Sequence, residues 1–176
     1  MRRIATGASP AANQELLLDP SNTAADDRLE LCRRFVATVQ HSTNLGIEVL
    51  ETGEDRVRCR MPWRAELVGN PETGVIHGGA VFAFLDQVGG LANACAIYPD
   101  YEITPTIDFR LDHLRPAESG RAVIGDGVCY RLSSQVAFVR VTAFAEGLEE
   151  EPVATGLATY MRMKIPRNAG GEASGE

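Results

Sequence analysis

The sequence predicts an α+β fold in which one long helix is wrapped by a curved antiparallel sheet of five or six strands. A helical pattern comes first, a hairpin and a long apolar helix follow, and four strand-like runs then succeed one another without an intervening helix. Consecutive strands favour antiparallel pairing, whereas alternation with helices would favour a parallel sheet. A helix that is apolar on nearly all sides needs cover from several directions, and a curved sheet would provide it.

The length and composition predict a single globular domain. The chain has 176 residues, of which 44% are hydrophobic and 23% are charged, and these are ordinary values for one domain. We expect residues 1–25 to form a mobile arm, because they are rich in Ala, Ser, Asn and Pro and lack an apolar period. Residues 167–176 are predicted to be a disordered tail, so that the folded domain covers residues 26–166.

The first predicted helix opens with Asp26 and Asp27, and its apolar residues recur at spacings of three and four as far as Val39. Acidic residues at its start suit the helix dipole. After Leu45 the apolar period changes toward two, which predicts a hairpin of residues 47–50 and 57–61 that ends at Pro62. Residues 68–74 are rich in turn formers and predict a loop.

The central helix is predicted to run from His77 to Tyr98, HGGAVFAFLDQVGGLANACAIY, and to stop at Pro99. Its 22 residues would extend about 33 Å. Strict alternation then predicts a strand over residues 106–114, with Ile107, Phe109 and Leu111 on one face. The remaining strands are expected at residues 121–130, 135–145 and 153–163.

Charge and composition argue against several classes of partner. A net charge of −7 gives no general field for attracting nucleic acid. No apolar run approaches the roughly 20 residues that span a bilayer, so we expect no membrane segment, and the apolar cluster Leu16–Leu18 is too short for a secretory signal. The cysteines form no C-x-x-C pair, which favours small buried side chains in a reducing cytoplasmic setting; they are Cys32, Cys59, Cys95 and Cys129.

Two glycine pairs distinguish the predicted central helix from an ordinary core helix. Gly78-Gly79 opens it, where backbone N–H groups have no intrahelical acceptor and lie at the positive end of the dipole. Such donors suit an anion or a developing oxyanion, although the pair could instead simply turn the chain into the helix. Gly89-Gly90 lies in the interior, where glycine costs about 1 kcal/mol relative to alanine, and we expect close packing there against a neighbouring backbone.

Asp86 is the second unusual feature, because it lies between Leu85 and Val88 on a helix with almost no polar face. An unpaired buried carboxylate is costly, so it usually pairs, becomes protonated or has a chemical role. We favour a role in catalysis, and a salt bridge to an arginine of the sheet is the alternative.

The spacing of Gly78 and Asp86 predicts a site shared between subunits. The two residues are eight positions apart, about 12 Å along the helix axis. An oxyanion donor and a base or nucleophile must both come within about 3 Å of one reacting group, which one helix does not allow. Two such helices packed antiparallel about a dyad would bring Gly78 of one subunit near Asp86 of the other.

The stretch NPETGVIHGG, residues 70–79, is followed by Asp86 nine residues after His77. This combination resembles the hotdog-fold acyl-CoA thioesterases, in particular the phenylacetate-degradation and 4-hydroxybenzoyl-CoA thioesterase-like branch. The resemblance continues through TIDFRLDHLRPA, residues 106–117, and loosely covers residues 40–164. It implies a hotdog fold and hydrolysis of aryl- or medium-chain acyl-CoA to free acid and CoA, at a site shared between two subunits.

The resemblance also implies roles for individual residues. Asp86 would be the nucleophile or the general base that activates water. Gly78, with help from Gly79, would polarise the thioester carbonyl through backbone N–H groups. Thr106 matches a Ser/Thr position that assists from the subunit supplying Asp86.

By the same resemblance, His77 and Asn70 would orient the thioester or the water. Asn70 lies seven residues before His77, where some relatives have six. Structural alternatives remain: Asn70 before a proline is a common turn residue, His77 could only cap the helix, and Thr106 could only begin a strand. His41 and His113 match no site position and are interpreted as structural.

The CoA part of the substrate would need groups that meet its phosphates, and arginine suits phosphate recognition. Most arginines are expected to be ordinary surface charges. The candidates are Arg110, Arg131 and the Ser133-Ser134 turn, with Arg115, Arg140 and Arg162 as further arginines.

We expect no resident cofactor, since CoA would be part of the substrate, and no metal, because the three histidines lack ligand spacing. The expected assembly is a homodimer or homotetramer. Two other functions stay open: a hotdog-fold enoyl-CoA hydratase or dehydratase, and a non-catalytic acyl-CoA-binding protein. The first pairs a histidine with an acidic residue in another arrangement, and the sensors of the second kind usually carry a basic DNA-binding segment that residues 1–40 lack.

Overall fold

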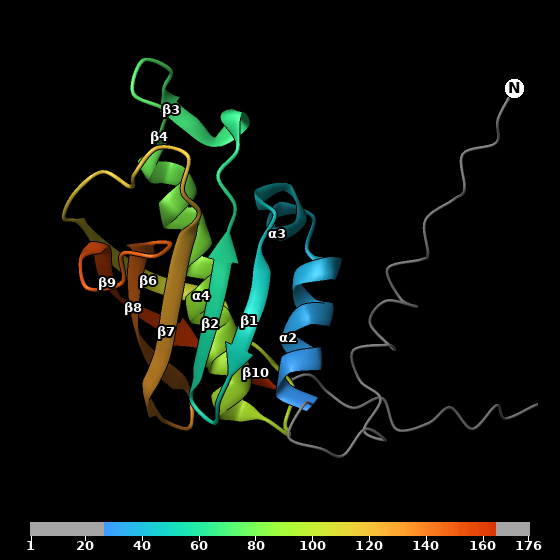
Figure 1. Ribbon diagram of the computed structural model, residues 1–176. Helices are drawn as coiled ribbons and strands as arrows, with labels where there is room; N and C mark the ends of the chain where they lie inside the picture. Colours follow the sequence, from blue (N-terminus) through green and yellow to red (C-terminus); the bar gives the residue numbers. More distant parts are fainter. Residues whose placement is uncertain (1–26, 165–176) are drawn as a thin grey trace, which may run out of the picture.

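The computed structural model describes residues 27–164, so the predicted arm 1–25 and tail 167–176 lie outside the described residues. Its main sheet has six antiparallel strands in the spatial order β1-β2-β7-β8-β9-β6 and curves around helix α4 (Figure 1). The predicted α+β architecture is therefore confirmed. The helical elements are α2 (Asp27–Thr38), α3 (Gln40–Leu45), the short 3₁₀ helix η1 (Ala65–Leu67) and α4 (Gly78–Ile97).

The strands fall into one large and two small sheets. The main-sheet strands are β1 (Glu48–Thr52), β2 (Arg56–Met61), β6 (Thr106–His113), β7 (Val123–Leu132), β8 (Val136–Ala145) and β9 (Pro152–Met161). The small sheets pair β3 (Val68–Asn70) with β4 (Val75–Ile76), and β5 (Glu102–Ile103) with β10 (Met163–Lys164).

The N-terminal part contains one helix more than predicted. α2 starts with acidic residues and carries an i,i+4 ion pair between Glu30 and Arg34, with 2.8 Å between Oε1 and Nε. The short helix α3 follows and ends at Gly46, whose φ of 69° is readily adopted by glycine. The loop predicted over residues 68–74 is likewise a small hairpin, because β3 pairs with β4 around a tight turn.

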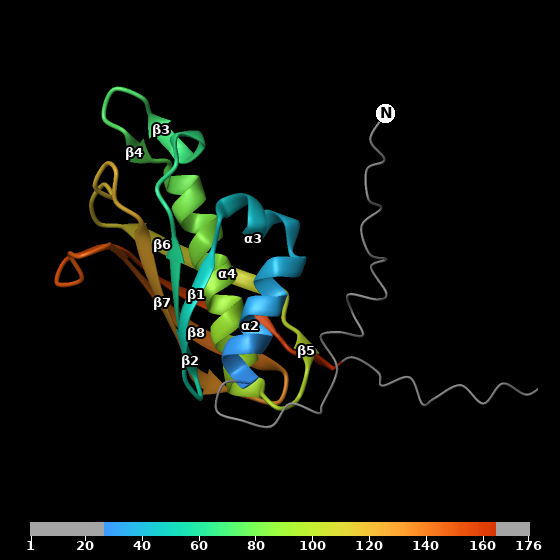
Figure 2. The ribbon, with the colours of Figure 1, turned by 45° about the vertical axis from the view of Figure 1, so that its right-hand side comes forward.

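α4 packs closely on the sheet because two glycines of β7 leave room for it. A Cβ at Gly125 would lie 2.7 Å from the Phe84 ring, and one at Gly127 would lie 2.9 Å from the Val88 side chain. On the opposite side α4 is covered by α2 (Figure 2). The four cysteines of the described chain are buried and free, as predicted, and Cys32 and Cys95 join α2 to α4 with 3.7 Å between their Sγ atoms.

The expectation that no run is long and apolar enough to cross a membrane is wrong for α4, whose 20 residues meet both criteria. The helix nevertheless lies between the sheet and α2 (Figure 2), and Phe84, Leu85 and Val88 have no solvent exposure. Its apolar surface is therefore that of a core helix.

β6 forms one edge of the main sheet, and among the described strands it pairs only with β9. The alternation predicted for this strand is interrupted at its start, where the pairing register shifts between Thr106 and Asp108. Ile107 is 54% exposed, so part of the apolar face predicted for β6 is not covered within one chain.

Candidate active site

Asp86 lies in the middle of α4, and two strands hold its carboxylate. The Thr106 hydroxyl of β6 donates a hydrogen bond to Oδ1 at 2.8 Å. The Tyr160 hydroxyl of β9 donates to the Asp86 backbone carbonyl at 2.9 Å and lies 3.4 Å from Oδ1. No arginine within residues 27–164 forms an ion pair with Asp86, so the alternative of a structural salt bridge is wrong.

Tyr160 is a member of this site that sequence reasoning missed. It is only 1% exposed, and burial, the charge of Asp86 and the hydrogen bond to it all raise the pKa of Tyr160, so the phenol stays a protonated donor. Gly89 makes room for it, since a Cβ there would overlap the hydroxyl oxygen and lie 3.0 Å from Cζ. Close packing at Gly89 is thus confirmed, against a side chain rather than a backbone. The available signal was a tyrosine within an apolar predicted strand, because a buried tyrosine needs a hydrogen-bond partner.

The irregular start of β6 explains how Thr106 reaches Asp86. Strict alternation would put Thr106 on the face opposite Ile107, with the polar residues of the strand. The register shift between Thr106 and Asp108 breaks this alternation, and Thr106 points toward α4. A bulge that redirects one side chain is common beside active sites, and here it supplies a donor to the carboxylate.

The start of α4 is organised by its own cap. The exposed His77 is the N-cap residue, and its Nδ1 accepts a hydrogen bond from the Gly79 N–H at 2.9 Å, so the capping role is confirmed. This bond occupies the Gly79 donor. Gly78, as the first helical residue, keeps an N–H without an intrahelical acceptor, and it is the donor left for a substrate.

His113, interpreted from the sequence as structural, lies beside Gly78. A Cβ at Gly78 would be 3.4 Å from the His113 Cε1 atom, and both residues line a cavity of about 380 Å³ together with Arg115. The overlooked signal is the strand period of two, which places His113 on the same face as Phe109. That face is turned toward α4, because Phe109 packs on Phe82.

Asn70 lies in the turn of the β3–β4 hairpin, which projects beyond the start of α4 (Figure 1). Its Oδ1 accepts a hydrogen bond from the Glu72 N–H at 3.0 Å, and its carbonyl accepts one from the Gly74 N–H at 2.9 Å. Within one chain Asn70 therefore acts as the turn residue that the alternative predicted, and its role in orienting substrate stays a prediction.

The structure distributes the CoA candidates over two places. Arg110 is 77% exposed on β6 and pairs with Asp112 at 3.2 Å. The Ser133 hydroxyl closes the β7–β8 turn by bonding to the Val136 backbone. The remaining candidates of this turn, Arg131 and Ser134, are exposed.

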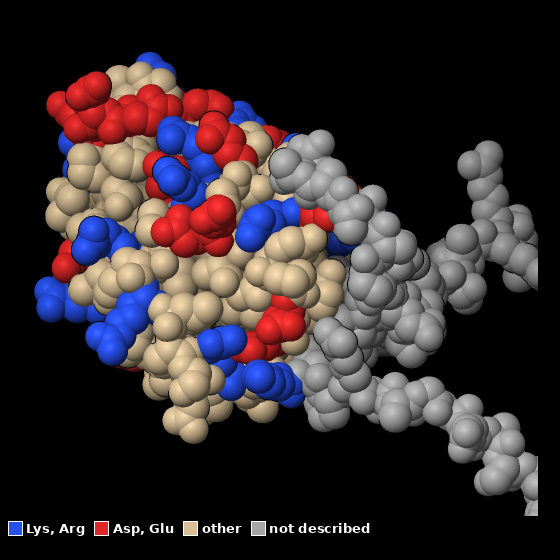
Figure 3. Space-filling view, turned by 90° about the horizontal axis from the view of Figure 1, so that it is seen from below, with Lys and Arg blue, Asp and Glu red and all other residues tan. Residues whose placement is uncertain are grey.

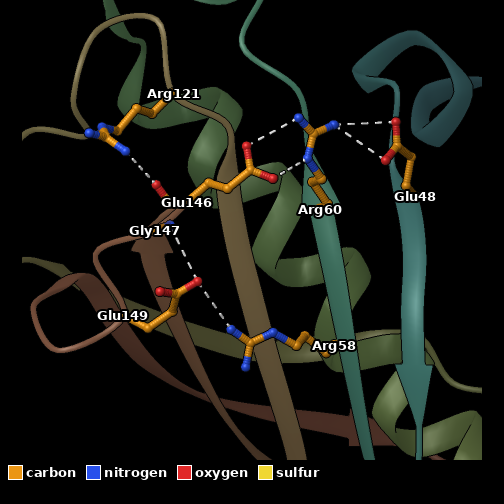
Figure 4. Close-up of polar contacts among 7 residues, drawn as sticks. All are labelled: Glu48, Arg58, Arg60, Arg121, Glu146, Gly147 and Glu149. Atoms are coloured by element: carbon orange, nitrogen blue, oxygen red, sulfur yellow. Dashed lines mark hydrogen bonds and ion pairs between the residues drawn. The ribbon is translucent and has the colours of Figure 1, made fainter.

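Several other arginines are neutralised on the outer side of the sheet (Figure 4). Arg60 makes a two-pronged contact with Glu146, at 2.6 and 3.2 Å, and reaches Glu48 at 3.3 Å. The bond and the positive charge of Arg60 lower the pKa of Glu146. Arg58 pairs with Asp126 and Glu149. These paired side chains are poor candidates for holding phosphates.

Charges of both signs are interspersed on the face seen in Figure 3, so no single-sign field marks it as a docking surface. Within residues 27–164, no three His, Cys, Asp or Glu side chains are arranged to hold a metal ion.

The family model of the thioesterase superfamily matches residues 73–151, which contain Asp86 and the start of α4. A protein of Halobacterium salinarum named as an esterase is 31% identical over 142 residues, covering 77% of this chain and 93% of the relative. The chain belongs to the thioesterase superfamily. It is a thioester hydrolase, and the resemblance seen in the sequence is confirmed.

Two further relatives of this thioesterase agree. The medium/long-chain acyl-CoA thioesterase YigI of Escherichia coli is 27% identical over 139 residues, which cover 72% of this chain and 88% of that protein. A crystal structure of a Pseudomonas aeruginosa protein superposes with a TM-score of 0.70 at 38% identity, covering 77% of this chain and 99% of that one. The hotdog fold implied by the resemblance is therefore confirmed as well.

Proposed function

We propose that this thioesterase hydrolyses acyl-CoA thioesters to free acid and CoA at a site built by two subunits. The superfamily and the acyl-CoA activity named for YigI support this substrate class. CoA enters as part of the substrate and leaves as a product, so the proposal needs no resident cofactor. The four free, buried cysteines of the described chain are consistent with a cytoplasmic setting.

The shared site rests on one observation, the course of β6 beside α4. Thr106 at the start of β6 binds Asp86, while His113 at its end lies beside Gly78. The site thus has two halves, the carboxylate of Asp86 and the N–H of Gly78, and each end of β6 lies beside one of them. Within one chain the two halves stay about 12 Å apart along α4, too far to act on one thioester carbon.

A second copy of the chain would bring the two halves together. The part of α4 halfway between Gly78 and Asp86 touches the middle of β6, since the rings of Phe82 and Phe109 have centroids 4.6 Å apart. A twofold axis near this contact would exchange the two ends and pair one β6 edge with the other. It would also cover Phe82 and Ile107, which are 41% and 54% exposed in the single chain.

The chemistry then follows from the free atoms of each half. Thr106 and Tyr160 engage Oδ1 of Asp86, which leaves Oδ2 to act. Oδ2 either takes a proton from the water that attacks the thioester carbon or attacks that carbon itself to form an anhydride that water cleaves. The N–H of Gly78 from the other subunit holds the oxyanion, and the C–S bond breaks as the CoA sulfur leaves and takes up a proton.

Mixing two inactive variants tests the proposal. Asp86→Asn removes the reacting carboxylate, and Gly78→Pro removes the N–H at a helical position that accepts proline. The preceding residue, His77, has ψ 134°, as residues before proline prefer. We expect each variant alone to release thiol from acyl-CoA at no more than about a hundredth of the wild-type rate. Subunit exchange between them should restore about a quarter of wild-type activity, because half of the dimers then hold one intact site.

Each variant carried alone through the same exchange procedure is the control. A mixture that shows only the summed residual activities, although mass spectrometry confirms mixed dimers, would place the whole site within one chain. A wild-type protein that releases no thiol from any acyl-CoA would remove the proposed substrate class.

A further inference from the structure

A groove of about 470 Å³ runs along α4 from the proposed catalytic carboxylate toward the end of the helix. Asp86 and Thr106 lie at one end of the groove. Leu31 and Phe35 of α2 line it together with residues of α4. The groove reaches Ile97, eleven residues beyond Asp86, which is about 16 Å along the helix. It is therefore long and lined by apolar side chains from two helices.

The two interior glycines of α4 differ in a way that points to this groove. Gly89 is required by packing, because a Cβ there would overlap the Tyr160 hydroxyl. A Cβ at Gly90 would meet no atom within 4 Å, and Gly90 lines the groove. Close packing, expected for both glycines, is thus wrong for Gly90. Glycine weakens a helix interior relative to alanine, and at Gly90 the packing gives no reason for it.

The wall opposite α4 is held in place by a buried ion pair. Glu102 of β5 lines the groove, and its side chain is only 1% exposed. Arg162 donates two hydrogen bonds to its carboxylate, both at 2.7 Å, and a third to the Ser133 carbonyl at 2.5 Å. The Pro105 carbonyl accepts another bond from the Met161 N–H. The groove is therefore preformed, which suits a ligand site.

We propose that the groove holds the straight acyl chain of the thioester, and that Gly90 sets the chain length this enzyme accepts. This inference rests on the proposed function, because Asp86 fixes the position of the thioester carbon. Gly90 lies four residues farther along α4, about 6 Å, where the chain would pass the helix. A bare backbone at that point leaves the groove open as far as Ile97.

The test compares dodecanoyl-CoA with butyryl-CoA in wild-type enzyme and in Gly90→Leu. Each buried methylene strengthens binding about four-fold, so the wild type is expected to prefer the longer substrate in kcat/KM. A leucine side chain would displace about three methylenes and lower the dodecanoyl to butyryl ratio about sixty-fold. Gly90→Ala, which the structure accommodates without a clash, is expected to lower the ratio about four-fold.

The matched control is Ala37→Leu, which enlarges an exposed residue of α2 that does not line the groove. It is expected to leave the ratio as in the wild type. Calorimetric titration with dodecanoic acid supplies a readout that does not depend on hydrolysis, and Gly90→Leu is expected to weaken this binding at least ten-fold.

The outcomes separate this inference from the proposed function. Hydrolysis of acyl-CoA with a ratio that neither Gly90 variant changes would overturn the groove assignment and leave the function in place. A protein that hydrolyses no acyl-CoA but binds dodecanoic acid in a Gly90-dependent way would keep the groove and overturn the function. The straight-chain occupant would be overturned if the wild type preferred phenylacetyl-CoA to every straight-chain substrate and Gly90→Leu lowered kcat/KM equally for all of them.

Discussion

The start and the middle of α4 carry the two halves of the proposed site, and they are built in opposite ways. At the start, a backbone N–H of Gly78 is free because of helix geometry alone, and the neighbouring His77 is exposed. In the middle, Asp86 depends on donors from two strands: Thr106 binds its carboxylate, and Tyr160 binds its backbone carbonyl and lies near the same carboxylate oxygen. The first half is therefore local in sequence, whereas the second exists only after the sheet has closed around the helix.

The largest expected effect comes from replacing Asp86, in the middle of α4. Asp86→Asn is expected to lower kcat about 10³-fold, since a positioned base or nucleophile contributes about 10²–10⁴. The amide oxygen can still accept the hydrogen bonds from Thr106 and Tyr160, so the melting temperature should stay near that of the wild type. Thiol release from acyl-CoA and thermal unfolding measure the two effects.

Asp55→Asn is the matched control for this change, because Asp55 is exposed in the turn between β1 and β2 and contacts neither half of the site. It should keep wild-type rates. An Asp86→Asn enzyme with more than a tenth of wild-type kcat would show that another group carries the chemistry.

Replacing Gly78, at the start of α4, should have the next largest effect. Gly78→Pro is expected to lower kcat about 10²-fold, as loss of one oxyanion donor does. Gly78→Ala keeps the N–H and places its Cβ 3.4 Å from His113, so it separates the donor from the shape of the site. Equal losses in the two variants would mean that steric access at Gly78 matters and the N–H does not.

The same contrast explains which parts of the site could be predicted from the sequence. The glycines at the start of α4 and the lone carboxylate at Asp86 stand out in the chain itself. Thr106 could be named only by resemblance, because its orientation depends on a register shift against β9. The sites of His113 and Tyr160 depend on which strand lies beside which end of α4, and no local pattern specifies that.

The fold shows the same division. The long helix and the main strands follow from strong apolar periods, and they were predicted nearly to their ends. The short elements α3, β3 and β5 have two to six residues, too few for a period to appear. Their geometry comes from contacts such as the bidentate bond between Arg162 and Glu102, which joins residues 60 positions apart.

A milder change sharpens the comparison within the middle half. Thr106→Val removes the hydroxyl that donates to Asp86 Oδ1 at 2.8 Å and keeps the shape of the side chain. We expect kcat to fall about ten-fold, in line with the loss of one hydrogen bond to a charged group, about 1.5–3 kcal/mol. Thr106→Ser restores the hydroxyl and should recover most of the rate. A ten-fold fall in both variants would mean that the threonine methyl, and not the hydrogen bond, positions the carboxylate.

The smallest expected effect tests whether His77 does more than cap the helix. His77→Ala removes the acceptor of the Gly79 N–H and is expected to cost about 1 kcal/mol of stability, a fall in melting temperature of about 3 °C. His77→Asn supplies another capping oxygen and should restore the stability. If the cap is the whole role, kcat recovers with it, since Gly78 is then held as before. If the stability returns while kcat stays more than ten-fold low, the imidazole must contact the thioester or the water, and the start of α4 would then contribute a side chain as well as a backbone donor.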